Sequence, residues 1–209
     1  MSPVAPPTNT HVNALRRQGY KLVAGMDEVG RGCFAGPVTV AAVILPPRLK
    51  IAGVRDSKLL SPARRRVIAN IIKYRALAIG IGWASAVEID ELGLTAAIRQ
   101  AGTRALADLG AYDAVLLDGS FNYLGDALVC QTLVRADQLS QSVAAASVVA
   151  KVARDSYMTR LSRRFPNYGF DAHKGYGTPV HRTAIVKYGL TDYHRRTWLS
   201  AAPITSAIA

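Results

Sequence analysis

The chain has 209 residues, 50% of them hydrophobic, which is enough to bury the core of one domain. Its 26 lysines and arginines outnumber its 14 acidic residues and give a formal net charge of +12, which favours a polyanionic partner. The lack of an apolar run of about 18 residues and of a lipidation signal argues against a membrane protein. We therefore expect a nucleic acid partner and no membrane partner.

The two cysteines, Cys33 and Cys130, are too far apart for a zinc pair and too few for a secreted disulfide scaffold. We therefore expect a reducing, cytoplasmic location, and we expect a monomer. Residues 1–19 contain three prolines and no apolar segment typical of a signal peptide. They predict a flexible N-terminal tail, with the fold beginning near Tyr20 and one domain over residues 20–209.

In the first half of the chain, apolar runs at residues 21–26 and 38–45 flank a glycine-rich segment and predict two paired strands. Ser61 followed by Pro62 predicts the start of a helix that runs to about residue 76. The serine hydroxyl can cap the helix, and proline suits its first position. Residues 79–84 are predicted to form the next strand.

The second half alternates helices with strands. The predicted helices cover residues 88–92, 94–109, 142–165 and a region from about 179, and the predicted strands cover residues 114–117 and 127–134. These two strands lead into Asp118 and Asp137. The alternation predicts an α/β fold, and the two adjacent early strands predict a mixed rather than a purely parallel sheet.

Acidic residues stand at the ends of three predicted strands. Asp27 and Glu28 end the first one, where successive side chains point to opposite faces, so a buried carboxylate there needs a partner. With Asp118 and Asp137 they could converge at one sheet edge and bind Mg²⁺ or Mn²⁺, and two such ions about 4 Å apart hydrolyse phosphodiesters. Alternatively, each aspartate only caps a helix or starts a turn, and spacing alone leaves both interpretations open.

Several short motifs occur in order along the chain. They are Met26-Asp27-Glu28-Val29-Gly30-Arg31-Gly32, Gly36-Pro37, Arg55-Asp56-Ser57-Lys58, Leu117-Asp118-Gly119, Ala144-Ala145-Ala146-Ser147, Ala150-Lys151 and His173-Lys174-Gly175-Tyr176-Gly177-Thr178. Together they closely resemble ribonuclease HII, over nearly the whole chain. The Asp-Glu-x-Gly-Arg-Gly element and the later His-Lys-Gly-Tyr element are the most specific of them.

The resemblance implies an RNase H-like fold, with a mixed central sheet flanked by helices and a C-terminal helical segment. It implies that Asp27, Glu28, Asp118 and Asp137 bind Mg²⁺ or Mn²⁺ and form the active site. It also implies an endonuclease that cleaves the RNA strand of RNA–DNA hybrids and nicks DNA duplexes 5′ of an embedded ribonucleotide, leaving a 3′-hydroxyl and a 5′-phosphate. At the fourth acid, Arg135-Ala136-Asp137-Gln138 departs from the family's usual Lys-Gly-Asp-Ser or Lys-Ala-Asp-Ser, but the carboxylate is kept.

The segment Gly30, Arg31 and Gly32 is expected to contact substrate, because glycines let the backbone approach closely and expose amides, while arginine can hold a phosphate. Its alternative role is a tight turn between two strands. Tyr176 matches the family's tyrosine that packs on the sugar at the junction of RNA and DNA. Its alternative is a loop aromatic packed on the core.

Two lysines, Lys58 and Lys151, match family positions near the substrate backbone, and either ammonium could contact a phosphate or balance the acids. Lys151 shares a helix face with Asp155, so a surface ion pair explains both residues almost as well, and Asp155 is left out of the catalytic set. The arginines at positions 64–66 are expected to be a solvated run, although their place in the first turn of a helix also suits phosphate binding.

His173, His181 and His194 lack the spacing of a helical zinc site, and we expect ordinary loop or surface histidines rather than metal ligands. Cys33 is expected to serve packing, with sensitivity to oxidation as a remote alternative.

Two other functions compete with the ribonuclease. The same fold and metal site could serve a DNA-specific nuclease or a strand-transfer enzyme, because fold does not dictate substrate. The net charge alone would also suit a non-enzymatic nucleic-acid binder, although such a protein has little reason to gather carboxylates where phosphate must approach.

Overall fold

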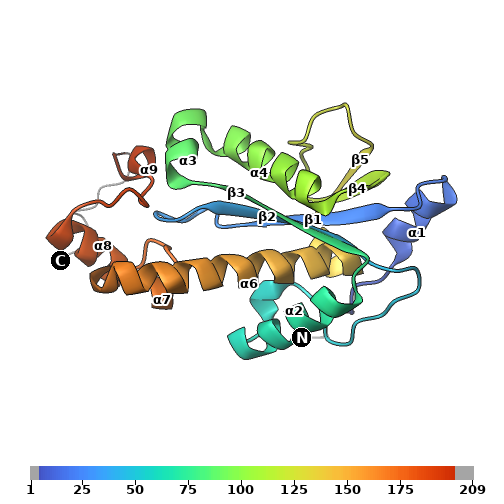
Figure 1. The fold of residues 1–209 in the computed structure, drawn as a ribbon, viewed down its shortest axis with the longest axis horizontal. Coiled ribbons are helices and arrows are strands. Elements are labelled where there is room, and N and C mark those ends of the chain that lie inside the picture. Colours follow the sequence, from blue (N-terminus) through green and yellow to red (C-terminus); the bar gives the residue numbers. More distant parts are fainter. Residues whose placement is uncertain (1–4, 201–209) are drawn as a thin grey trace.

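The computed structural model describes residues 5–200, and it contains a five-stranded sheet with the order β3-β2-β1-β4-β5 (Figure 1). The strands are β1 (Val23–Val29), β2 (Val38–Ile44), β3 (Ala78–Ala84), β4 (Ala114–Asp118) and β5 (Cys130–Leu133). The first three strands pair antiparallel, whereas β1 pairs with β4 and β4 with β5 in parallel. The predicted mixed sheet is therefore confirmed.

Helices cover both faces of this sheet and extend past one end of it (Figure 1). They are α1 (Thr10–Arg17), α2 (Pro62–Arg75), α3 (Ala86–Leu92), α4 (Leu94–Leu109), α5 (Ala136–Leu139), α6 (Gln141–Arg164), α7 (Phe170–His173), α8 (Pro179–Tyr188) and α9 (Arg196–Ser200), with short 3-10 turns η1 (Ser57–Leu59) and η2 (Pro166–Tyr168). Within the described residues, no helix is both long and apolar enough to span a membrane.

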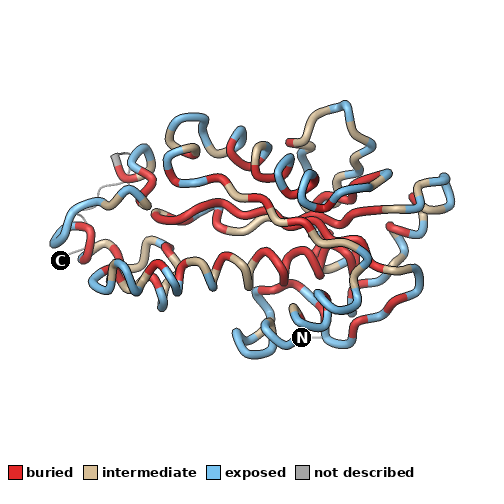
Figure 2. Tube along the Cα trace, in the orientation of Figure 1, coloured by how far each residue is buried: buried red, intermediate tan, exposed pale blue. Residues whose placement is uncertain are grey.

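The core lies on both sides of the sheet, between α4 on one face and α6 with α2 on the other (Figure 2). Small residues allow this close packing. A Cβ added at Gly82 in β3 would lie 1.8 Å from the carbonyl oxygen of Ala101 in α4, and one added at Gly25 in β1 would lie 2.4 Å from the main chain of Ser142 in α6. The alanine-rich start of α6 is buried against the same face.

The first strand extends further than its apolar residues suggested. The apolar run predicts a strand over residues 21–26 with the two acids at its end, but β1 continues through Val29, because its ladder with β2 pairs Asp27 with Ala41 and Glu28 with Val40. The strand expected over residues 127–134 is shorter, and Asp137 lies in α5 rather than directly after a strand.

The N-terminal segment also differs from the expectation that the fold begins near Tyr20. Helix α1 buries Val12 and Leu15 in a cluster with β4 and α6, and Thr8 forms a bridge with Ser140. Residues 1–4 of the expected tail and residues 201–209 of the expected domain lie outside the described residues.

Candidate active site

Parallel pairing places three of the four predicted acids at one end of the sheet. Met26 of β1 lies opposite Leu117 of β4, so Asp27 and Asp118 are the next residues along the two neighbouring strands. Asp137 is the fourth residue after β5 ends, in the first turn of α5. Carboxyl ends of adjacent parallel strands meet at one edge, which is where open α/β sheets bind their ligands.

The two adjacent acids of β1 point to opposite faces of the sheet. Asp27 lies on the α6 face, where burial raises the pKa of its carboxyl well above its ordinary value, and the charges of Glu28 and Asp118 raise it further. The pKa of Glu28 is also raised by burial, while Arg31, 3.1 Å from its Oε1, opposes the shift. Its other carboxylate oxygen, Oε2, is buried without a hydrogen-bond partner among residues 5–200.

Asp137 belongs to the same electrostatic cluster. Burial raises the pKa of its carboxyl to about 6, and the charges of Asp56 and Asp118 add to the shift. Buried carboxylates that repel one another, together with an unpaired buried oxygen, form a donor set that fits a hard divalent cation such as Mg²⁺ or Mn²⁺. These residues could therefore hold a metal.

The acids are also engaged by the protein itself. Asp27 Oδ1 accepts a hydrogen bond from the Glu28 amide (2.8 Å), and Asp118 Oδ1 accepts one from the Ala136 amide (2.6 Å). In the part of the chain that is described, no three acidic, histidine or cysteine side chains converge closely enough to hold one ion as they stand.

Asp56 is a member of this cluster that the sequence patterns do not single out. Its side chain is buried, caps η1 by accepting a hydrogen bond from the Lys58 amide (2.9 Å), and raises the pKa of Asp137. In the Arg55-Asp56-Ser57-Lys58 motif, only the lysine is a predicted site residue. Lys58 itself is exposed, and its positive charge opposes the rise in the pKa values of Glu28 and Asp137, so it lies near the acids.

The glycine-rich segment and Tyr176 lie next to each other. Cys33 forms an antiparallel bridge with Tyr176, so the loop that ends β1 runs beside the loop that carries the tyrosine. Arg31 and Gly32 are exposed, and Tyr176 keeps 39% of its surface accessible. Cys33 is fully buried beneath them, which agrees with the packing role expected for it.

Lys151 connects this region to α6. Its ammonium donates to Asp155 Oδ1 at 2.8 Å and lies 5.8 Å from the centre of the Tyr176 ring. The ion pair expected as an alternative is therefore present, together with a contact to the proposed substrate residue. Arg65 lies 3.7 Å from the other oxygen of Asp155 and donates to the carbonyls of Ser57 and Leu60, so it is not the solvated side chain we expected.

The three late histidines form a cluster under the Tyr176 loop, rather than the loop or surface residues we expected. His181 and His194 are buried, with their Nε2 atoms 3.1 Å apart, and His173 stacks on His181 at 4.4 Å between ring centres. His181 Nδ1 lies 2.9 Å from the Tyr176 carbonyl, while His194 Nδ1 accepts from the Thr191 amide. These hydrogen bonds can all form with neutral rings, if His194 Nε2 donates to His181 Nε2 and His181 Nδ1 donates to the Tyr176 carbonyl.

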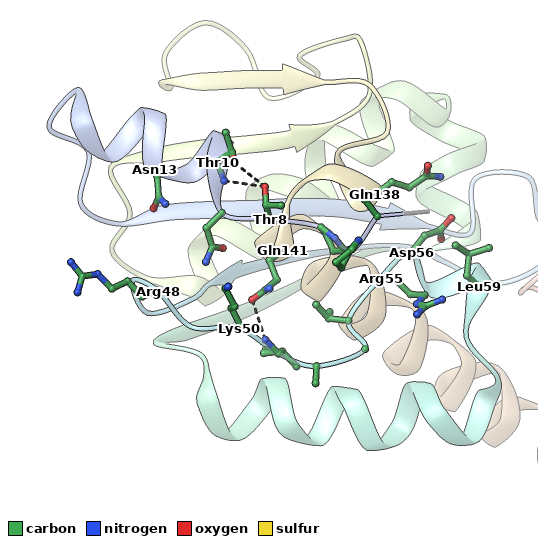
Figure 3. Close-up of a pocket in the computed structure, with 18 residues that line it drawn as sticks. Thr8, Thr10, Asn13, Arg48, Lys50, Arg55, Asp56, Leu59, Gln138 and Gln141 are labelled. Atoms are coloured by element: carbon green, nitrogen blue, oxygen red, sulfur yellow. Dashed lines mark hydrogen bonds between the residues drawn. The ribbon is translucent and has the colours of Figure 1, made fainter. Parts of the chain in front are cut away.

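Two open cavities whose linings include basic residues adjoin the site. One, of about 830 Å³, has Arg48 and Lys50 near one end and Arg55, Asp56 and Gln138 near the other (Figure 3). The second, which we call the basic groove, has a volume of about 680 Å³ and adjoins Tyr176. Its charged lining includes Arg65, Arg66, Lys151, Arg160 and Lys174. Lysine and arginine side chains in a concave surface attract a polyanion.

Comparison with known proteins identifies the family. The ribonuclease HII family profile matches residues 24–201. Ribonuclease HII of Streptomyces avermitilis is 47% identical over 205 residues, covering 96% of this chain and 88% of that protein. The enzyme of Moorella thermoacetica is 52% identical over 186 residues, covering 88% and 89%.

Solved structures agree. The ribonuclease H2 of Pyrococcus horikoshii superposes with a TM-score of 0.73 at 26% identity, covering 87% of this chain and 96% of that chain. The ribonuclease HII in the PCNA complex from Archaeoglobus fulgidus also superposes with a TM-score of 0.73 at 26% identity, covering 88% and 97%. The chain therefore belongs to the ribonuclease HII family and is a ribonuclease H enzyme with an RNase H-like fold.

Proposed function

We propose that the chain is a metal-dependent endonuclease that cleaves the RNA strand of RNA–DNA hybrids and nicks DNA duplexes 5′ of an embedded ribonucleotide. The products carry a 3′-hydroxyl and a 5′-phosphate. The observation that carries the proposal is the parallel register of β1 and β4, which sets Asp27 beside Asp118; burial raises the pKa of the Asp27 carboxyl, and the charges of Glu28 and Asp118 raise it further. Like charges are gathered where a polyanionic substrate must approach, an arrangement that a cation would stabilise.

Asp27, Glu28, Asp118 and Asp137 are the proposed ligands. Two divalent cations, Mn²⁺ or Mg²⁺, would supply Lewis-acid chemistry for phosphodiester hydrolysis at this cluster. The contribution of the chain is to hold the carboxylates on rigid strands and on the first turn of α5, close enough to repel one another. Because burial and the charges of neighbouring acids raise the pKa values of Asp27, Glu28 and Asp137, cation binding should release protons.

Substrate contact is assigned to the segment Gly30, Arg31 and Gly32, of which Arg31 and Gly32 are exposed, together with Tyr176. Open space around Gly32 leaves its backbone accessible to a phosphate or a 2′-hydroxyl. Tyr176 offers a ring on which a sugar can pack. Lys58 and Lys151 add positive charge beside the acids and beside the tyrosine ring, respectively, where substrate phosphates would lie.

We also propose that residues 20–209, with α1 packed against them, act as one catalytic domain, as a cytoplasmic monomer whose partners are RNA–DNA hybrids and ribonucleotide-containing DNA. The basic linings of the two cavities and the net charge of +12 support a nucleic-acid partner.

The test is a nicking assay with three labelled substrates, namely a DNA duplex carrying one ribonucleotide, an RNA–DNA hybrid and an all-DNA duplex, each with Mn²⁺ or Mg²⁺. The first two should be cut and the third left intact. An Asp118→Asn variant should bind the duplexes but barely cut them, whereas Asp126→Asn, at an exposed loop position, should match the wild type.

Equal cutting of the all-DNA duplex would favour a DNA nuclease instead. Metal-independent binding without turnover, in a folded preparation, would favour a non-enzymatic binder. Either result would overturn the proposal.

A further inference from the structure

Two arginines are completely buried behind the proposed substrate loops. Arg154 lies in α6 and Arg195 just before α9, and each has 0% of its surface exposed. Within residues 5–200 neither is paired with a carboxylate, and both guanidinium groups donate to main-chain carbonyls. Burying an unpaired guanidinium is costly unless its donors are satisfied, so their placement calls for an explanation.

Arg195 donates hydrogen bonds to the Gly30-Arg31-Gly32 segment, which is proposed to contact substrate. Its Nη2 donates to the Gly30 carbonyl and its Nη1 to the Arg31 carbonyl, both at 2.6 Å, and its Nε reaches the Gly36 carbonyl at 3.2 Å. In a trans peptide the carbonyl and the following amide point in opposite directions. The amides of Arg31 and Gly32 therefore point away from Arg195, and neither donates a hydrogen bond within the described chain.

Arg154 joins this segment to the loop that carries Tyr176. Its Nε donates to the Pro37 carbonyl (2.8 Å), its Nη2 to the Ala35 carbonyl (3.1 Å) and its Nη1 to the Lys174 carbonyl (2.9 Å). The same side chain explains one of the glycines, because a Cβ at Gly30 would lie 2.3 Å from Arg154 Nε. The loop thus rests directly on the guanidinium.

The positive charge of Arg195 also acts on the amides that it does not contact. Burial lowers the pKa of Arg195 to about 10, so the side chain stays protonated at neutral pH. A desolvated cation behind outward-facing amides strengthens their attraction for an anion or a hydroxyl oxygen, because the intervening protein screens charge less than water does.

We propose that Arg195 and Arg154 are positioning residues for ribonucleotide recognition. Arg195 fixes the Arg31 and Gly32 amides toward substrate, and Arg154 fixes that loop relative to Tyr176. This inference rests on the proposed function and adds the residues that set its specificity. A lysine cannot replace either arginine, because one ammonium cannot reach three carbonyls in the fixed geometry of a guanidinium.

The test compares the wild type with Arg195→Lys and Arg154→Lys, using nicking kinetics and duplex affinity. Each variant should lose about tenfold to a hundredfold in kcat/KM on the single-ribonucleotide duplex, since misplacement by about 1 Å costs that much. In an Asp118→Asn background, the preference for the ribonucleotide duplex over all-DNA should fall while affinity for all-DNA stays unchanged. In the single lysine variants, which keep all four acids, the rise in Tm with Mn²⁺ should match that of the wild type. Arg104→Lys is the matched control, because Arg104 donates to the Trp83 carbonyl on the surface.

The outcomes separate the two proposals. A wild type that does not nick the ribonucleotide duplex overturns the proposed function. A wild type that nicks, with folded lysine variants that keep both rate and preference, overturns the positioning role.

Nuclear magnetic resonance of the wild type gives an answer even where a lysine variant fails to fold. The Arg195 side-chain N–H signals should exchange slowly with solvent, and the Arg31 and Gly32 amides should shift with the ribonucleotide duplex more than with all-DNA. Fast exchange, or equal shifts with both duplexes, contradicts the proposal.

Discussion

Carboxylates that repel one another dominate the chemistry of individual residues at this site. Asp27 is buried on a rigid strand, and Glu28 and Asp118 both raise the pKa of its carboxyl. A raised pKa means that the folded protein binds this proton more tightly than the unfolded chain does. The stability linked to the protonated form is therefore lost as pH rises above about 4 and through the folded pKa. At neutral pH without metal, Asp27 costs stability.

Asp27→Asn should therefore stabilise the metal-free protein while abolishing nicking. We expect the free energy of unfolding at pH 7.5, measured by urea titration with a chelator, to rise, because the amide removes a buried and repelled charge. In the wild type, Mn²⁺ should raise Tm, and in the variant this rise should shrink. A variant less stable than the wild type under chelation would show that the carboxylates do not repel one another in this way.

The histidine cluster gives a pH dependence of opposite sign. Burial lowers the pKa values of His181 and His194 to about 4 from an ordinary 6.5, so the unfolded chain takes up protons that the folded protein excludes. Their contribution to stability is complete above pH 6.5 and is lost as pH falls toward 4.

His194→Gln should weaken this dependence, because the amide can donate to His181 and accept from Thr191 without titrating. The loss of unfolding free energy between pH 7 and pH 5 should be smaller in the variant than in the wild type. His11→Gln, in α1 outside the cluster, is the control. An unchanged pH dependence in His194→Gln would contradict neutral, buried rings.

Some residues at the site can be named from sequence and others cannot. Asp27 and Glu28 stand in a motif whose residue types carry the chemistry themselves. Arg154 and Arg195 act on main-chain carbonyls, which every residue has, so nothing in the residues opposite them marks the contact. Asp56 escapes prediction because an aspartate before a serine and a lysine also suits a helix cap, a role it fills as well.

At the scale of elements, contact between α4 and the sheet decides how closely the layers pack. Gly80 and Gly82 in β3 leave no room for a side chain, because an added Cβ would lie 2.0 Å and 1.8 Å from carbonyl oxygens of α4. These glycines are in extended backbone, so close approach rather than an unusual φ requires them.

Gly82→Ala should force α4 away from β3 and cost about 1 to 3 kcal/mol of unfolding free energy, as overpacked cores do. Chemical denaturation measures the loss, and Thr103→Ala on the exposed face of α4 is the control. If the glycine variant is as stable as the control, the layers are not in close contact there.

Most elements could be predicted because apolar periodicity and capping residues mark them, as in α2, where the Ser61 hydroxyl caps the helix. The sequence does not predict helix α1, because its buried stripe consists of Val12 and Leu15 alone, in a segment that follows several prolines. Nor does it predict the end of β1, because pairing with β2, rather than the polarity of Asp27 and Glu28, decides where the strand stops.

At the scale of the whole molecule, positive charge surrounds a cluster of acids. The net charge of +12 draws in a polyanion, while the basic groove offers it a path beside Tyr176. Positive charge on this surface should raise the affinity for any duplex. It should not change the preference for a base sequence or for ribose over deoxyribose, because phosphate contacts position a duplex without distinguishing one from another.

The paired variant Arg66→Gln with Arg160→Gln should weaken binding of ribonucleotide and all-DNA duplexes alike. The slope of log affinity against log salt should fall by about 1 for each phosphate that the variant no longer neutralises. Arg75→Gln, at the far end of α2 and outside both cavities, is the control. A change in the preference between the two duplexes, or an unchanged salt slope, would contradict a purely electrostatic role.

The claim that Asp27, Glu28, Asp118 and Asp137 form the centre of a ribonucleotide-sensing nuclease is tested most directly by nicking a DNA duplex that contains one ribonucleotide. With Mn²⁺ or Mg²⁺, the wild type should cut on the 5′ side of that ribonucleotide and leave all-DNA intact, and Asp118→Asn should bind but barely cut. Cutting of both duplexes at equal rates, or undiminished cutting by Asp118→Asn, would contradict it.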